Sequence, residues 1–444
     1  MVSRFVRPSP TAALILYTLL LRLALPLALA RLYWRGLRVP AYRHRVGERL
    51  AWGAPAPRAG IWIHAVSVGE VQAAEPLIRS LLERAPSRRI LVTTTTPTGA
   101  ARLRALFGDA VSHRYTPFDL PGILERFLDR IRPRLAIVME TEIWPNTLNL
   151  CARRGIPVVL ANARLSERSA RGYARLAGLT RATLERFALI AAQADADAQR
   201  FIALGANPRR VRVMGSIKFD LSQPADLPAR AREMRRLWCE RRPVWVAAST
   251  HEGEDGPLLE AHRRVLERIP NALLVLVPRH PERFEHVAAL VERHGLSLVR
   301  RSRHDACRDE TAVFLGDTMG ELPIFLAAGD AAFIGGSLVP TGGHNPLEAA
   351  AAGVPVATGP HTFNFAAIMD LLVREGAAAR IESADALADL LIEWLTDAER
   401  RANIGARGQR VIARNRGALV RLIDLIEGVV GKSPDSGDPP QAII

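Results

Sequence analysis

The chain has 444 residues, 48% of them hydrophobic, and this length predicts roughly two to three domains with packed cores. Its formal net charge of +15 indicates an acidic partner: nucleic acid, an anionic membrane or a phosphorylated substrate. Aromatic residues make up 6% and do not interleave with basic residues, which disfavours single-stranded nucleic-acid binding, and we expect no nucleic-acid partner. The three cysteines are widely spaced, which favours a reducing compartment and argues against a disulfide framework.

Residues 11–30 are apolar except for Arg22, and this segment is long enough to span a bilayer. Arg22 and Pro26 weaken a clean spanning helix, so a segment that inserts only part way is also open. A signal peptide is the main alternative, because basic residues precede the segment and residues 28–30 resemble a cleavage site. An amphipathic helix packed on the protein itself is disfavoured, because the segment has no polar face.

A basic cluster follows this apolar segment, with only Glu48 opposing it. Such a cluster holds its side of a membrane segment in the cytoplasm and binds anionic headgroups. We therefore expect residues 1–35 to form an uncleaved membrane anchor with a basic flank. The cluster consists of Arg31, Arg35, Arg38, Arg43, Arg45 and Arg49.

From Ile61 onward, apolar strands alternate with helical runs, which predicts parallel sheets with helices on both faces. The pattern runs to about Gly215, is interrupted by a polar connector, and restarts at Pro243, so we expect two α/β halves. Strands are expected in the first half at 61–66, 89–94, 134–139, 156–161, 188–192 and 211–214. Strands are expected in the second half at 244–248, 272–277, 312–316, 331–335 and 354–357.

The stretch 340–360 predicts a glycine loop, a helix and a buried strand. Gly342 and Gly343 allow a sharp turn that brings backbone N–H groups close to a ligand, and Asn345 is a good N-cap. A helix N-terminus behind such a loop suits a phosphate, and Glu348, one turn further, could accept hydrogen bonds from ribose hydroxyls. The alternative is a capping box of Asn345 and Glu348 at an ordinary turn.

Polar and charged residues follow the strands of both halves, where open parallel sheets bind their ligands. So many at one end of each half favour a cleft between two domains. Lys218 and Arg279 lie in tight turns after apolar strands, which favours anion binding over solvated surface charge. The residues in these turns include Ser67, Glu70, Glu140, Glu142 and Lys218 in the first half, and Arg279, His280, Gly320 and Glu321 in the second.

Asp195 and Asp197 form a D-x-D pattern like that of metal-dependent sugar transferases. They lie at a strand-to-helix turn, so we interpret them as helix-capping residues. The histidines lack metal-ligand spacing, and we expect no metal ion.

Five motifs together resemble the Kdo (3-deoxy-D-manno-octulosonic acid) transferases, which are membrane-associated bacterial enzymes of lipopolysaccharide inner-core synthesis. The resemblance covers roughly residues 30–430. The motifs are IWIHAVSVGE at 61–70, METEIWPN at 139–146, GSIKFD at 215–220, PRHP at 278–281 and GGHNPLE at 342–348.

The resemblance implies an α/β chain of GT-B architecture, with two Rossmann-like domains facing a cleft. Residues 36–220 would bind the acceptor, 221–240 would be a linker, 241–430 would bind the nucleotide sugar, and 431–444 would be a disordered tail. It implies CMP-Kdo as donor, a lipid A precursor as acceptor and no cofactor. The enzyme would work on the cytoplasmic face of the inner membrane and invert the anomeric centre.

The resemblance also assigns roles to the turn residues. Glu70 is the expected general base, kept ionised by its helix N-terminus, and Glu140 and Glu142 are the rival bases. Ser67, Glu140, Glu142 and Lys218 would face the acceptor or the Kdo carboxylate. The donor would be held by Arg279, His280, Gly320, Glu321, Gly342, Gly343, Asn345 and Glu348.

Two other classes of function stay open. The first is another two-domain nucleotide-sugar enzyme, either a different glycolipid glycosyltransferase or an epimerase, although an epimerase leaves residues 11–30 unexplained. The second is a non-catalytic protein that binds an anionic membrane through its basic face. That function leaves Glu70, Glu140 and Glu142 unexplained, because acidic residues weaken lipid binding.

Overall fold

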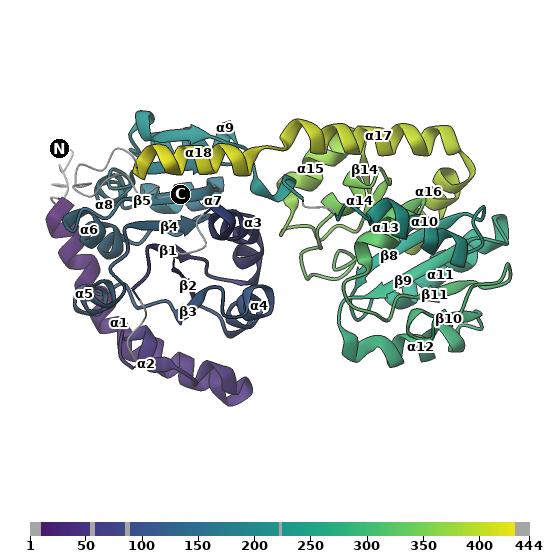
Figure 1. Ribbon diagram of the computed structural model, residues 1–444, viewed down its shortest axis with the longest axis horizontal. Helices are drawn as coiled ribbons and strands as arrows, with labels where there is room; N and C mark the ends of the chain where they lie inside the picture. Colours follow the sequence, from purple (N-terminus) through teal and green to yellow (C-terminus); the bar gives the residue numbers. More distant parts are fainter. Residues whose placement is uncertain (1–9, 54–57, 85–88, 222–223, 431–444) are drawn as a thin grey trace, which may run out of the picture. The chain divides into compact units, whose positions relative to one another are not determined.

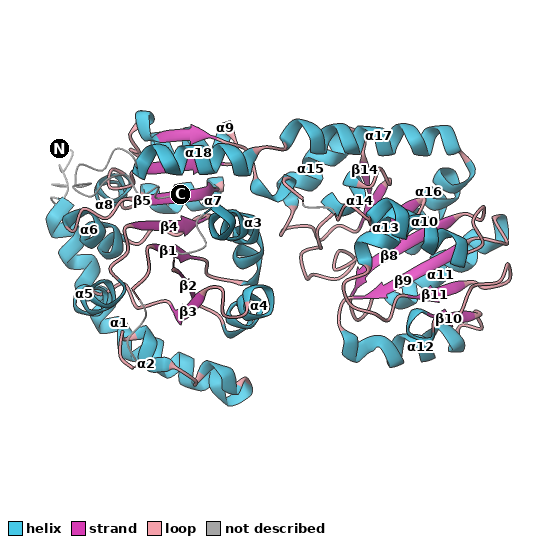
Figure 2. Cartoon of the chain, in the orientation of Figure 1, coloured by secondary structure: helices cyan, strands magenta, loops and turns pink. Residues whose placement is uncertain are grey.

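Two parallel β-sheets organise the chain (Figures 1 and 2). The computed structural model describes residues 10–53, 58–84, 89–221 and 224–430, so the tail predicted at 431–444 lies outside the described residues. The chain divides into two units. The first comprises Met1–Asp220 and Arg416–Ile444, and the second comprises Leu221–Asn415.

The first unit contains a seven-stranded parallel sheet with strand order β3-β2-β1-β4-β5-β6-β7. Strand β1 lies between β2 and β4, with Ile61 paired to both Ile90 and Leu135. The strand order reverses between β1 and β4, and such a switch point is where ligands bind in open α/β sheets. The strands are β1 (Ile61–His64), β2 (Ile90–Thr94), β3 (Ser112–Tyr115), β4 (Leu135–Met139), β5 (Val158–Ala163), β6 (Leu189–Ala192) and β7 (Val211–Val213).

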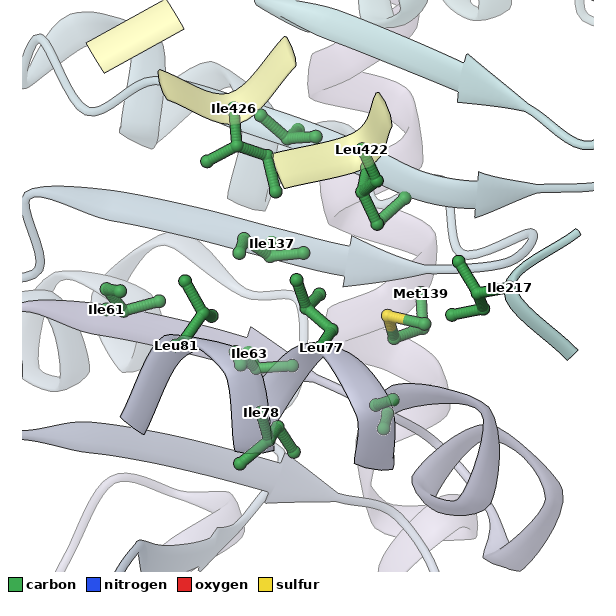
Figure 3. Packing of buried hydrophobic residues seen from close by; sticks show 14 of the residues in the cluster. Ile61, Ile63, Leu77, Ile78, Leu81, Ile137, Met139, Ile217, Leu422 and Ile426 are labelled. Carbon is green, nitrogen blue, oxygen red and sulfur yellow. The ribbon is translucent and has the colours of Figure 1, made fainter. Parts of the chain in front are cut away.

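Helices cover both faces of this sheet because its strands are apolar on both sides. In β1, Ile61 and Ile63 point into one core, whereas Trp62 points into the other. Figure 3 shows the first of these cores. The helices are α1 (Pro10–Arg38), α2 (Val46–Arg49), α3 (Val68–Arg84), α4 (Pro97–Phe107), α5 (Pro121–Ile131), α6 (Pro145–Arg153), α7 (Glu167–Ala174), α8 (Ala177–Leu184), α9 (Asp195–Ala203) and α18 (Ala418–Val430).

The second unit also contains a seven-stranded parallel sheet, in the order β10-β11-β9-β8-β12-β13-β14, with its switch point between β8 and β12. Its strands are β8 (Val244–Thr250), β9 (Leu273–Pro278), β10 (Leu298–Arg300), β11 (Val313–Leu315), β12 (Ala331–Ile334), β13 (Val356–Thr358) and β14 (Ala378–Arg380). Its helices are α10 (Leu227–Leu237), α11 (Asp255–Arg268), α12 (Phe284–Arg293), α13 (Leu322–Ala328), α14 (Leu347–Ala351), α15 (Ala366–Arg374), α16 (Ala384–Thr396) and α17 (Ala398–Asn415).

The sequence pattern did not predict strands β3, β10 and β14. All three lie at sheet edges, and most of their residues are only half-buried or exposed. An edge strand that is exposed to solvent on one side has no continuous apolar run, so its sequence does not stand out as a strand.

Two expected domain ranges differ from the structure. The linker expected at 221–240 contains α10, whose Leu227, Ala231 and Met234 are buried within the second unit. Helix α18 was expected in the second domain but belongs to the first. Its Leu422 and Ile426 pack on the core around β1 (Figure 3).

The apolar N-terminal segment forms α1, which is long and apolar enough to cross a membrane. The expectation that it would not pack on the protein is wrong. Leu21 and Leu25 contact the core of the first unit. The lack of a polar face therefore does not exclude packing on the protein, because one face of α1 contacts the core while the opposite apolar face stays exposed.

Candidate functional site

The turn after β1 places Ser67 and Glu70 at the switch point of the first sheet. Helix α3 begins at Val68, so Glu70 lies in its first turn. The Glu70 carboxylate folds back over the turn and accepts a hydrogen bond from the backbone N–H of Val66 at 2.8 Å. This contact fixes the carboxylate beside the end of the central strand.

Burial, together with the negative charges of Glu140 and Glu142, raises the pKa of Glu70 to about 8, against the opposing effects of the Val66 N–H and Lys218. The expectation that the helix N-terminus keeps Glu70 ionised is therefore wrong. Loss of hydration and two like charges outweigh the helix end. Glu70 holds a proton at neutral pH in the free protein and is a stronger base than an exposed carboxylate.

Glu140 and Glu142 come from the turn after β4, on the other side of the switch point. Glu140 has a left-handed backbone conformation, with φ of 57°, while its N–H still donates to Ala161 of β5. Its side chain lies 3.7 Å from the Lys218 ammonium. Burial raises the pKa of Glu142, and the charge of Glu140 adds to this effect. The structure therefore brings together Glu70, Glu140, Glu142 and Lys218, as the sequence predicted.

His64 ends strand β1 directly beneath this turn and was not among the expected site residues. Its Nδ1 lies 3.0 Å from the Thr93 hydroxyl and 3.3 Å from that of Thr116. Burial lowers the pKa of His64 to about 4, so the ring is neutral. Among the described residues, its Nε2 has no hydrogen-bond partner, and the Trp144 ring centroid lies 6.4 Å from that of the imidazole.

In the second unit, the glycine loop folds back on the segment after β12. Gly342 and Gly343 have φ of 100° and 75°, the left-handed region that favours glycine. The N–H of Gly343 donates to Gly336 at 2.7 Å, and the N–H of His344 donates to Gly335 at 3.1 Å. These two N–H groups lock the loop, so they are not the free donors that the sequence predicted for a phosphate.

The helix after this loop is shorter than expected and begins later. Helix α14 spans Leu347–Ala351, with Pro346 rather than Asn345 at its N-cap position. The Asn345 amide oxygen accepts from the Leu347 N–H at 3.1 Å, and its side chain also hydrogen-bonds Glu348. Burial raises the pKa of Glu348. The local contact between Asn345 and Glu348 is therefore present, whatever else the carboxylate binds.

Three histidines lie close together beside Arg279. His251 follows β8, His280 follows β9, and His344 lies in the glycine loop. His251 and His344 approach to 2.8 Å between their Nε2 atoms, and the ring of His280 lies 5.4 Å from that of His251. Burial, together with the charges of His251, Arg279 and His280, lowers the pKa of His344 to about 4. The two close nitrogens therefore share one proton rather than carrying two.

Glu254 organises the backbone around this histidine group. Its buried carboxylate accepts hydrogen bonds from four backbone N–H groups, which fixes the turn after β8 to the turn after β12. Those donors are His251, Gly336, Ser337 and Leu338, at 2.7 to 2.9 Å.

Gly320 and Glu321 follow β11. Gly320 has a φ of 85°, and the Glu321 carboxylate binds Arg301 through two contacts of 2.9 and 3.0 Å. The hydrogen bond from Arg301 holds the pKa of Glu321 below its usual range. Glu321 is therefore an ionised carboxylate with an internal partner.

Comparison with known proteins gives the family. Residues 44–221 match the family model described as 3-deoxy-D-manno-octulosonic-acid transferase (kdotransferase), and residues 257–411 match glycosyl transferases group 1. The chain is 45% identical over 415 residues to the 3-deoxy-D-manno-octulosonic acid transferase of Haemophilus influenzae, covering 93% of this chain and 97% of that protein. The chain belongs to the Kdo transferase family.

Further comparisons agree on the family and the fold. The Kdo transferase of Bordetella pertussis is 38% identical over 438 residues, covering 94% of this chain and 99% of that protein. A glycosyltransferase structure from Rickettsia africae aligns with a TM-score of 0.53 at 12% identity, covering 85% of this chain and all of that one (100%). The two Rossmann-like sheets of this Kdo transferase thus form a GT-B glycosyltransferase fold.

Both aspartates of the D-x-D pattern lie in the first turn of α9, whose N-cap position is Ala194 rather than the expected Asp195 or Asp197. Asp197 accepts a hydrogen bond from the backbone N–H of Leu165 at 2.9 Å and lies 3.5 Å from Arg200. Asp195 is the first residue of α9. Within the described ranges, no group of three or more His, Cys, Asp or Glu side chains is placed to hold a metal ion.

Sequence reasoning did not assign His64, His251, Glu254 or His344 to the site, although each lies inside or next to a turn or motif that it singled out. No spacing rule connects His251 to His344, because 93 residues separate them. The one available signal was their position, since each follows a buried strand in a turn rich in glycine and polar residues.

Proposed function

We propose that this Kdo transferase moves Kdo from CMP-Kdo to a hydroxyl of a lipid A precursor, on the cytoplasmic face of the inner membrane. The observation that carries the proposal is the group of Glu70, Glu140, Glu142 and Lys218 at the switch point of the first sheet. This group lies in the unit that matches the Kdo transferase model. A lipid A precursor is anionic and apolar, which fits both the +15 charge and the exposed α1.

Glu70 is the proposed general base. A neutral alcohol is a poor nucleophile, and a base with a pKa near the working pH removes its proton most effectively. The pKa of Glu70 near 8 meets that condition, and the Val66 N–H orients the carboxylate. As the acceptor oxygen attacks the anomeric carbon, its proton passes to Glu70 and the bond from that carbon to the CMP oxygen breaks. Attack in one step inverts the anomeric centre.

Ser67, Glu140, Glu142 and Lys218 are the proposed contacts for the acceptor and for the Kdo carboxylate. Lys218 provides the positive charge that a carboxylate needs, and its distance of 3.7 Å from Glu140 leaves the pair looser than a direct hydrogen bond.

On the second unit, Arg279, His280, Gly320, Glu321, Gly342, Gly343, Asn345 and Glu348 remain the proposed donor site. The Arg279 backbone is fixed by a 3.0 Å hydrogen bond to Thr250, so its guanidinium extends from a rigid position. We assign Arg279 to the phosphate and the half-buried Glu348 to the ribose hydroxyls. Gly342 and Gly343 shape the loop, and the Gly343 N–H is already used within it.

Donor and acceptor are tested together with purified protein and a tetra-acylated lipid A precursor. Separate reactions receive CMP-Kdo, another CMP-sugar or UDP-sugars, and mass spectrometry identifies the products. We expect a product that has gained Kdo, and only with CMP-Kdo. Transfer from a UDP-sugar, or no transfer from CMP-Kdo, would refute the proposal.

A further inference from the structure

One stripe of α1 faces the first unit along most of the length of the helix. Its half-buried residues recur every three or four positions, which is one face of an α-helix. Helix α1 lies against α6 and α8 (Figure 1), and it also contacts the short 3-10 helix Pro40–Tyr42 that follows it. The stripe consists of Leu14, Tyr17, Thr18, Leu21, Leu25, Ala28, Leu29 and Leu32.

Two polar side chains near the middle of the apolar segment fasten this stripe to the protein. The Tyr17 hydroxyl donates to Asp119 at 3.0 Å, and the Thr18 hydroxyl lies 3.0 Å from the Asn146 amide oxygen and 2.8 Å from the Leu14 carbonyl. Asp119 and Asn146 are themselves buried, and Asp119 accepts two more hydrogen bonds from Thr147 at the start of α6. The two polar side chains of this otherwise apolar segment thus contact buried polar side chains of the first unit.

The opposite face of α1 is apolar and exposed. Ile15 is 64% exposed and Leu27 is 73% exposed, and leucines fill the same face between them. A continuous exposed patch of this kind marks an interaction site. The patch comprises Ile15, Leu16, Leu19, Leu20, Leu23 and Leu27.

Charged and aromatic side chains suited to a lipid headgroup region flank this patch. Arg22 is exposed beside it, and Tyr33 and Trp34 are exposed toward the C-terminal end of the helix. Arginine and these aromatic residues are enriched where a membrane meets water. Arg31, Arg35 and Arg38 add positive charge, so the surface matches an anionic bilayer rather than an apolar protein groove.

The packed stripe is incompatible with a helix that crosses the bilayer. A spanning segment of about 20 residues would place Tyr17 and Thr18 roughly 10 Å from its outer end, inside the hydrocarbon. Asp119, Asn146 and the loops around them would have to enter the lipid with that segment. Irregular backbone exposed to lipid does not occur at that depth.

We propose that α1 is an in-plane membrane anchor. It stays fastened to the first unit through Tyr17 and Thr18, and its outer face lies in the cytoplasmic leaflet of an anionic bilayer. The proposal rests on the membrane association proposed above and not on the transfer reaction. Both ends of α1 and the whole catalytic chain are then on one side of the membrane, with the first unit held at the lipid surface.

Cysteine labelling tests on which side of the membrane the helix begins. The exposed Thr11→Cys is introduced into the full chain in a Cys239→Ser background, and Glu399→Cys, on an exposed position of the second unit, marks the cytoplasmic side. We expect a membrane-impermeant maleimide to label both sites in inverted inner-membrane vesicles and neither site in intact spheroplasts. Labelling of Thr11→Cys in spheroplasts, with Glu399→Cys protected, would overturn the in-plane arrangement.

Quenching by spin-labelled lipids tests the depth of the same helix. A fluorophore is attached at Leu20→Cys or at Leu27→Cys, both on the exposed face. An in-plane helix gives equal, shallow depths, whereas a spanning helix places residue 20 near the bilayer centre and residue 27 about 10 Å further from the centre, at 1.5 Å per residue. Recovery of the unlabelled chain in the soluble fraction would instead refute membrane association itself, so the two failures are distinguishable.

Discussion

The Lys218 ammonium lies 3.7 Å from the Glu140 carboxylate, and both charges shift the pKa of Glu70, which burial raises most. Glu140 raises that pKa and Lys218 lowers it, so the two charges shift the pKa of the proposed base in opposite directions. Because the base must be deprotonated to act, the rate should rise with pH and level off above the pKa near 8.

The first prediction is that removing either member of this pair shifts the pH profile in a known direction. Glu140→Gln removes a negative neighbour, so the pKa of Glu70 falls and the rising limb of kcat/KM moves to lower pH. Lys218→Gln removes the positive neighbour, so the limb moves to higher pH. Both variants lower the overall rate if the two side chains contact substrate, but only the pH of the rising limb reports their effect on the pKa of Glu70. Shifts of the limb in the same direction in both variants would contradict the opposite effects assigned to Glu140 and Lys218.

The second prediction is that Glu70→Gln lowers turnover by about 10²–10⁴-fold, as is typical when a general base is lost. CMP affinity should be unchanged, because the donor residues belong to the second unit. Glu142→Gln is the matched control, with a half-buried carboxylate of the same group. Near-normal turnover in Glu70→Gln with a collapse in Glu142→Gln would move the base to Glu142.

The same variant has a predicted effect on stability. The pKa of Glu70 is raised on folding from its usual value near 4.5 to about 8, so the folded state binds the proton more tightly. Its favourable contribution is complete below pH 4.5 and is lost as the pH rises through 8. Glu70→Gln should therefore raise the melting temperature relative to the parent at pH 9, with little difference at pH 5. An equal shift at both pH values would refute the assigned pKa.

The sequence predicted the two parallel sheets and the group of turn residues well, because buried strands of a parallel sheet are uninterrupted apolar runs. Glu70 and Glu140 could be grouped because each follows such a run, and the carboxyl ends of parallel strands meet at one edge. Lys218 follows the short edge strand β7, which ends at the same edge. Helix α18 could not be placed, since its core partners in β1 and α3 lie more than 300 residues earlier.

The protonation of Glu70 could not be predicted for a different reason. The sequence shows its position in the first turn of α3, which favours ionisation, but does not show how deeply the carboxylate is buried. Likewise, the helix start at Leu347 follows from the Asn345 amide oxygen, which accepts from the Leu347 N–H, a short-range contact that the sequence permits but does not determine.

The third prediction concerns the glycine loop. Gly342→Ala should destabilise the protein by about 1–3 kcal/mol, because φ of 100° is unfavourable for alanine and a Cβ there would overlap the side chains of Asn364 and Phe363. Gly256→Ala is the matched control in the same unit, since its Cβ would meet no atom within 4 Å. Urea unfolding measures both, and equal stabilities would show that the loop tolerates a side chain.

The last prediction separates the two roles open to Glu348. Its carboxylate hydrogen-bonds Asn345, whose amide oxygen also accepts from Leu347, so a purely structural role would appear as lost stability. If the carboxylate binds ribose, Glu348→Ala weakens CMP binding several-fold while the melting temperature stays nearly constant, because the contact from Asn345 to Leu347 survives. Glu348→Gln is the informative companion, since it keeps a hydrogen-bonding partner for Asn345 but loses the charge.

Calorimetric titration of CMP into both variants, together with their melting curves, distinguishes these roles. The ribose role predicts weaker binding in both variants, because a neutral amide accepts hydrogen bonds from two hydroxyls less strongly than a carboxylate does. The structural role predicts parent-like CMP affinity in both, with a lowered melting temperature in Glu348→Ala that Glu348→Gln restores. The raised pKa of Glu348 gives a second test, by pH dependence. If the ionised carboxylate binds ribose, the CMP affinity of the parent should fall as the pH drops toward that pKa. The Glu348→Gln variant should not show this pH dependence.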